Sequence, residues 1–95
     1  MPIYILLSSL TDKGRRTLKG NPNLIKEVNK EIEAFGVKVL MQYAVLGPYD
    51  FVNIVEAPDN NAILRTSVEL GSRGTIKILS MPAKSVDEFV KLLEK

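Results

Sequence analysis

The polar residues whose types and spacing could recognise a small molecule fall into two segments. In the turn 47–50, Tyr49 offers an aromatic ring and a hydroxyl, and Asp50 adds a carboxylate. In the segment 69–74, Arg73 lies between two glycines that would let an anion or a partner approach closely. Both segments also have a purely structural explanation, because Asp50 can accept backbone N–H bonds within the turn and the glycines can end a helix and form a turn.

The composition excludes several kinds of catalytic centre. The 95 residues include no cysteine and no histidine, which removes disulfides, thiol nucleophiles, Cys/His metal sites and imidazole acid–base catalysis. We therefore expect no metal and no other cofactor. An enzyme would have to use groups such as Asp50 or Glu56 with Tyr43 or Tyr49 acting on an acidic organic substrate. A role without catalysis is the favoured interpretation.

The charge balance argues against nucleic acid and membranes as partners. Thirteen basic against eleven acidic residues give a net charge of +2, and the two signs are mixed along the chain. The densest basic cluster, at 13–19, lacks the interleaved aromatic residues of a nucleic-acid surface. The apolar start of the chain has no basic region before it, and no run approaches the ~20 residues of a membrane span. We expect a cytoplasmic protein.

The hydrophobic pattern predicts a single domain, residues 1–95, of alternating strands and helices. In residues 3–10 both the odd-numbered and the even-numbered side chains are mainly apolar, which is typical of a strand covered on both faces. Asn21-Pro22 is a helix start signal inside the first helical region, and Gly36 and Gly71 are stop signals. The predicted strands are 3–10, 37–46, 51–57 and 75–81, and the predicted helices are 11–35 in two pieces, 59–70 and one that begins at a capping box at 85–88.

Two helical regions carry an apolar stripe along one side. In the first region the successive apolar residues are seven, three, four and three positions apart, and the opposite side of the helix is charged. Such a pattern indicates a helix with one side buried. The stripe residues are Leu18, Ile25, Val28, Ile32 and Phe35 in the first region, and Val86, Phe89, Val90 and Leu93 in the last helix, where they are also expected to be buried.

The order β-α-β-β-α-β with an added terminal helix predicts an α+β, ferredoxin-like fold with a four-stranded antiparallel sheet. Two helices cover only one face of such a sheet. An apolar second face should associate, and a second copy placing its own sheet there would form a dimeric α/β barrel. We therefore expect a homodimer or a higher even-numbered oligomer.

Strict alternation along the strands assigns two sets of side chains to this uncovered face. The apolar set would pack between the subunits, and the polar set would pair across the interface, hold water or line a pocket. The apolar set is Leu6, Leu40, Phe51, Val55, Leu79 and Met81, and the polar set is Tyr4, Ser8, Lys38, Gln42, Asn53 and Lys77.

Three hypotheses for function follow. In the first, Ser8, Gln42 and Asn53 orient a small organic molecule between two subunits, while Tyr49, Asp50 and Arg73 gate the site or recognise charge. In the second, the polar residues pair with one another, and the chain is a structural partner or assembly unit with a filled interface. The third hypothesis is the enzyme without a cofactor.

Three segments resemble the GYD domain family over nearly the whole chain. They are residues 7–14, 42–52 and 67–74, and the second contains the Gly47, Tyr49 and Asp50 turn. The resemblance implies a dimeric α/β barrel, and it implies no activity because the family largely lacks an assigned biochemical role. Other dimeric α/β barrels include monooxygenases and isomerases that need no cofactor.

A more distant similarity extends to the effector-binding domains of leucine-responsive-type regulators, which share the order of elements and the G-x-Y-D turn. Those domains bind amino acids at subunit interfaces. The similarity implies that Gly47, Tyr49 and Asp50 help to receive a small zwitterion or shape its interface. This chain carries no helix-turn-helix, so the similarity implies a stand-alone effector module.

Overall fold

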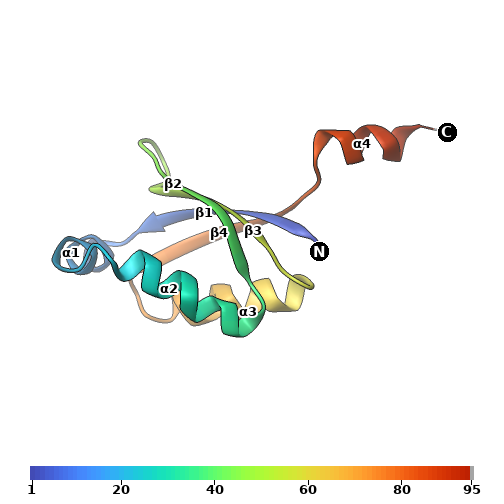
Figure 1. The fold of residues 1–95 in the computed structure, drawn as a ribbon. Coiled ribbons are helices and arrows are strands. Elements are labelled where there is room, and N and C mark those ends of the chain that lie inside the picture. The colour runs from blue at the N-terminus through green and yellow to red at the C-terminus, as the bar shows by residue number, and fades with distance from the viewer. Residues whose placement is uncertain (95) are drawn as a thin grey trace.

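The computed structural model describes residues 1–94 and confirms the predicted order of elements (Figure 1). The first helical region is in two pieces, as Asn21 and Pro22 indicated, and a short 3-10 turn extends the second piece. The elements are β1 (Ile3–Leu10), α1 (Asp12–Gly20), α2 (Leu24–Ile32), η1 (Glu33–Phe35), β2 (Lys38–Ala44), β3 (Phe51–Glu56), α3 (Asn60–Gly71), β4 (Ile76–Ala83) and α4 (Val86–Leu93).

The strands form a four-stranded antiparallel sheet in the order β2-β3-β1-β4. Helices α1, α2 and α3 lie together on one side of this sheet (Figure 1). This arrangement confirms the predicted α+β, ferredoxin-like fold. Within one chain the sheet is open, so a barrel made by two subunits remains a prediction. None of the helices in residues 1–94 is both long enough and apolar enough to cross a membrane.

The face of the sheet that lies under the helices carries side chains that were predicted on the other face. Tyr4, Leu6 and Ser8 are at most 5% exposed and Val55 is completely buried, and Leu6 lies opposite Asn53 in the pairing of β1 with β3. The placement of Tyr4, Leu6, Ser8, Gln42, Phe51, Asn53 and Val55 on the open face was therefore wrong.

Two local features explain this error. Both alternate sets of β1 are apolar, so hydrophobicity alone could not show which set faces the helices. In addition, β2 contains a bulge between Val39 and Met41. A bulge inserts an extra residue and shifts the alternation, so Gln42 falls on the same side as Val39.

The open face is more uniformly apolar than the sequence predicted. Leu79 and Met81 lie there as expected, and β4 pairs them with Leu7 and Ile5 of β1. Lys38 pairs with Glu56 and Lys77 with Ser9 near the ends of the strands, and Leu40 is exposed at the bulge. The remaining apolar residues of this face are Ile3, Met41, Tyr43, Val52 and Ile54.

Helix α4 projects away from the sheet and the other helices (Figure 1). Its start is capped as predicted, because the Glu88 backbone N–H donates to the Ser85 hydroxyl at 3.1 Å. Its predicted stripe is not buried, since Val86 is 75% and Phe89 52% exposed. An amphipathic pattern shows which side of a helix needs cover, and nothing in the described part of the chain covers α4.

Gly14 fixes the distance between α1 and the start of β4. Thr11 caps α1 by accepting from the Gly14 N–H at 3.1 Å and donates its own hydroxyl to the Gly74 carbonyl at 2.7 Å. Its backbone N–H donates to the Thr75 carbonyl at 3.0 Å. A Cβ atom added at Gly14 would overlap the Thr75 carbonyl oxygen, so a side chain here would push the helix off the sheet.

We predict that Gly14→Ala lowers the free energy of unfolding by about 1–3 kcal/mol, the usual cost of forcing extra atoms into a packed site. Gly20→Ala is the matched control, because Gly20 ends the same helix and an added Cβ would meet no atom within 4 Å. Urea denaturation followed by circular dichroism measures both variants. Equal stabilities for the two variants would contradict the close approach of α1 to Thr75.

Candidate functional site

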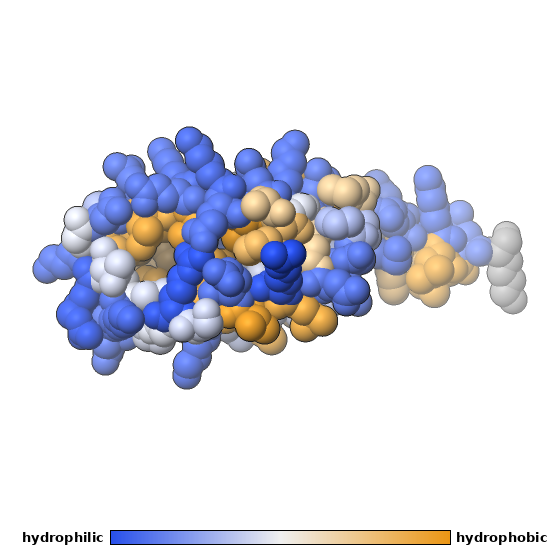
Figure 2. Space-filling view, turned by 90° about the horizontal axis from the view of Figure 1, so that it is seen from below, coloured by the Kyte–Doolittle hydropathy of each residue, from blue (hydrophilic) through white to orange (hydrophobic). Residues whose placement is uncertain are grey.

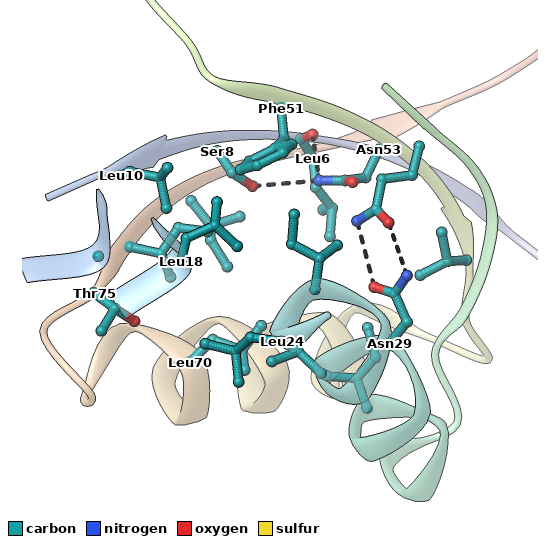
Figure 3. Close-up of a pocket in the computed structure, with 18 of the residues that line it drawn as sticks. Leu6, Ser8, Leu10, Leu18, Leu24, Asn29, Phe51, Asn53, Leu70 and Thr75 are labelled. Carbon is teal, nitrogen blue, oxygen red and sulfur yellow. Dashed lines mark hydrogen bonds between the residues drawn. The ribbon is translucent and has the colours of Figure 1, made fainter. Parts of the chain in front are cut away.

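A cavity of about 270 Å³ lies between the sheet and the helices (Figure 3). Figure 2 views the molecule from the helix side and shows apolar side chains recessed between hydrophilic ones. The walls are mainly apolar, and they come from all four strands, from α1 and α2 and from the end of α3. Apolar contributors include Leu6, Leu18, Leu24, Val28, Phe51 and Leu70.

Ser8 of β1 and Asn53 of β3 form a polar pair on the sheet side of this cavity (Figure 3). The Asn53 Nδ2 group donates to the Ser8 hydroxyl at 3.3 Å and to the Leu6 carbonyl at 3.4 Å. Both side chains are buried, with exposures of 2% for Ser8 and 7% for Asn53. The pair therefore places polar atoms inside an otherwise apolar wall.

One atom of this pair lacks a partner. The Asn53 Oδ1 atom is buried and accepts no hydrogen bond from any described residue. The amide orientation is defined by its neighbour, because the Leu6 carbonyl can only accept and so must face the Nδ2 group. A buried amide oxygen without a donor costs free energy, and such atoms are rare in folded proteins.

Asn29 of α2 and Gln42 of β2 close one side of the cavity with a reciprocal amide pair (Figure 3). Asn29 Nδ2 donates to Gln42 Oε1 at 2.8 Å, and Gln42 Nε2 donates to Asn29 Oδ1 at 3.3 Å. The bulge in β2 makes this contact possible because it turns Gln42 toward the helix. Each amide satisfies the other, so this pair holds α2 against β2.

Arg73, in the loop between α3 and β4, lines the cavity and bonds to two helices. Its guanidinium donates to both carboxylate oxygens of Glu31 on α2, and to Glu69 on α3 at 3.4 Å. Mainly through the hydrogen bond, Arg73 holds the pKa of Glu31 below its usual 4.5. The same bond raises the pKa of Arg73. Arg73 therefore ties α2 to the end of α3 beside the cavity.

The structure brings together four of the six residues predicted to bind a ligand. Ser8, Gln42, Asn53 and Arg73 line one cavity, but this cavity lies beneath the helices of a single chain and not between two sheets. The predicted residues of the turn, Tyr49 and Asp50, do not line it.

Asp50 has a structural role in connecting the hairpin to β1. Its Oδ2 atom accepts from the Leu10 backbone N–H at 2.7 Å, and its own N–H donates to the Ser8 carbonyl at 2.8 Å. Its carbonyl accepts from the Val45 N–H at 2.9 Å, which closes the hairpin. Asp50 thus accepts a backbone N–H bond, as the structural explanation expected, but the donor is Leu10 of the neighbouring strand and not a residue of the turn.

Asn29 and Glu31 are two residues of this region that the sequence did not identify. Asn29 follows Val28 of the apolar stripe and resembles any polar residue at the edge of a helix. Glu31 belonged to the side of the helix predicted to be charged and solvated. Their partners are 13 and 42 residues away in the sequence, and no local pattern signals such pairs.

We predict that the Arg73–Glu31 pair makes stability depend on pH in acid. A carboxyl whose pKa is lowered in the folded state stabilises the fold above its ordinary pKa, and this contribution is lost as the pH falls through the lowered value. Wild type should exceed Glu31→Gln in unfolding free energy by a constant amount above about pH 4.5, and the difference should vanish at lower pH. The effect should be small, because both partners are partly exposed.

Urea denaturation at a series of pH values measures this difference. Glu27→Gln is the control, because it removes a carboxyl from the exposed side of the same helix and leaves Arg73 paired. A gap between wild type and Glu31→Gln that stays constant throughout the acid range would contradict the assignment.

Comparison with known proteins places this chain in a family. A protein of Thermus thermophilus named "Glutamine synthetase and cystathionine beta-lyase binding protein" is 52% identical over 95 residues, which cover 99% of this chain and 100% of that protein. The family model described as the GYD domain matches residues 4–93. This match spans nearly the whole chain, and the chain therefore belongs to the GYD domain family.

Proposed function

We propose that this chain is a small protein-binding module that associates with itself and with metabolic enzymes, glutamine synthetase and cystathionine β-lyase among them. The observation that carries the proposal is the name of the Thermus thermophilus relative, together with its 52% identity along the full chain. The apolar surfaces left uncovered by the fold support it. The proposal retains the cytoplasmic location expected from the sequence.

The open face of the sheet is the surface that we assign to a second copy. It is broad, it is apolar across all four strands, and its charged residues Lys38, Glu56 and Lys77 lie near the ends of strands. Two sheets pack well face to face, because their twisted surfaces interdigitate at about 10 Å. Since Ser8, Gln42 and Asn53 face the helices, this interface would consist mainly of apolar contacts, as in an assembly unit.

The apolar side of α4 is the surface that we assign to the enzyme partner. The helix projects from the body of the molecule (Figure 1), and its exposed residues Phe89, Val90 and Leu93 follow helical spacing. An amphipathic helix presented in this way can fit an apolar groove on another protein. The apolar side of α4 is narrow, so the open face of the sheet is better suited than α4 to packing against the sheet of a second copy.

Two charged substitutions separate these surfaces. Leu79→Lys puts a charge in the middle of the open face, and Phe89→Lys puts one on α4. We predict that Leu79→Lys converts the dimer to monomer, and that Phe89→Lys keeps the dimer while weakening enzyme binding by about tenfold or more, the usual effect of losing a large apolar anchor. Light scattering after gel filtration measures the oligomer, and surface plasmon resonance with each purified enzyme measures the affinity.

Val68→Lys is the matched control, because Val68 is 71% exposed on α3, away from both surfaces. It should change neither measurement. A wild-type chain that binds neither enzyme would overturn the partner assignment. Enzyme binding that Phe89→Lys leaves unchanged would overturn the role of α4, and a wild-type monomer would overturn the role of the open face.

A further inference from the structure

We propose that the cavity between the sheet and the helices binds a neutral small molecule with an apolar body about the size of two fused aromatic rings and one hydroxyl group. The hydroxyl would bond to Ser8 and Asn53. The site lies within one chain, on the opposite side of the sheet from the face assigned to a second copy. It is therefore independent of the proposed protein partners.

The size and lining of the cavity define the apolar body. An engineered apolar cavity of about 150 Å³ binds benzene, and this cavity of about 270 Å³ is larger. Leu18, Leu24, Phe51 and Leu70 point into the same space from the sheet and the helices (Figure 3). A rigid apolar molecule with two fused rings would gain contacts on both sides and would leave little empty volume.

The Ser8–Asn53 pair defines the polar group. The Ser8 hydroxyl accepts from Asn53, and among residues 1–94 no acceptor is found for its own proton. The Asn53 Oδ1 atom lacks a donor. A ligand hydroxyl has one proton to donate and lone pairs to accept with, so one such group can satisfy both atoms.

The Asn53 side chain needs to move little to form these bonds with a ligand hydroxyl. The two bonds that hold the Asn53 amide are long, at 3.3 and 3.4 Å. The last torsion of an asparagine side chain is soft. A small rotation of the amide would present Oδ1 to a hydroxyl in the cavity, which both side chains line.

The electrostatics favour an uncharged ligand. Among the described residues that line the cavity, Arg73 alone is charged. Its guanidinium already forms salt bridges with Glu31 and Glu69. An anion would have to compete with two carboxylates for this group. A cation would meet no free carboxylate, since neither Asp nor Glu contributes to the lining.

The test compares 2-naphthol, which is uncharged in neutral solution, with naphthalene. A purely apolar hole would bind naphthalene more tightly, because naphthalene gains more from leaving water. We predict the reverse for wild type, with 2-naphthol binding about tenfold more tightly, as expected for a hydroxyl that completes a buried polar group. Titration followed by ¹H–¹⁵N and methyl NMR measures both affinities, and the resonances that shift identify the site.

Asn53→Leu should abolish the preference for 2-naphthol, because it removes the amide and keeps a side chain of similar size. Asn61→Leu makes the same change at an exposed position of α3 and should preserve the preference. If Asn53→Leu does not fold, Ser8→Ala removes the hydroxyl with a smaller change and carries the same expectation. The proposal would be overturned if neither compound bound, or if naphthalene bound wild type more tightly than 2-naphthol. It would also be overturned if the resonance shifts were confined to the open face around Tyr43 and Leu79.

Discussion

Strand β1, one of the two central strands of the sheet, is apolar on both of its faces, and the helices can cover only one of them. Tyr4, Leu6 and Ser8 take the covered side, which leaves Ile5 and Leu7 on the open side with their neighbours from β3 and β4. A sheet that buries one face and leaves the other apolar is not at its lowest free energy alone in water. This imbalance links the fold of one chain to its need for partners.

The order of elements and the fold class could be predicted because each depends on local signals. Thr11, Asp59 and Ser85 cap helices at the starts that the sequence predicted, and hydrophobic runs marked the strands. The assignment of faces failed for β1, for β3 and for Gln42, because it depends on which side of β1 meets the helices and on the bulge beside Val39. Both are consequences of packing between distant segments, which alternation within one strand does not reveal.

The candidate site was predicted in part and for an incomplete reason. Ser8, Gln42 and Asn53 were selected as polar residues on apolar strands, and they do lie together. Asn53 pairs directly with Gln42 and lies two residues from Phe51, the partner of Ser8, so all three share a face of the sheet. Asn29 and Glu31 come from a helix. They bond to Gln42 and Arg73, which are distant in the sequence and which folding brings next to α2. Asp50 was selected because a carboxylate can bind a charged ligand, yet its carboxylate accepts a hydrogen bond from the backbone of β1.

The hollow beneath the helices also affects how the folded chain responds to compression. A folded protein with internal void occupies more volume than its unfolded chain in water, and hydrostatic pressure therefore favours unfolding. Here the pocket of about 270 Å³ is partly open to solvent, so only the part of it that water leaves unfilled adds to this response to pressure. Any molecule that fills the hollow would reduce this volume difference and make the fold more resistant to pressure.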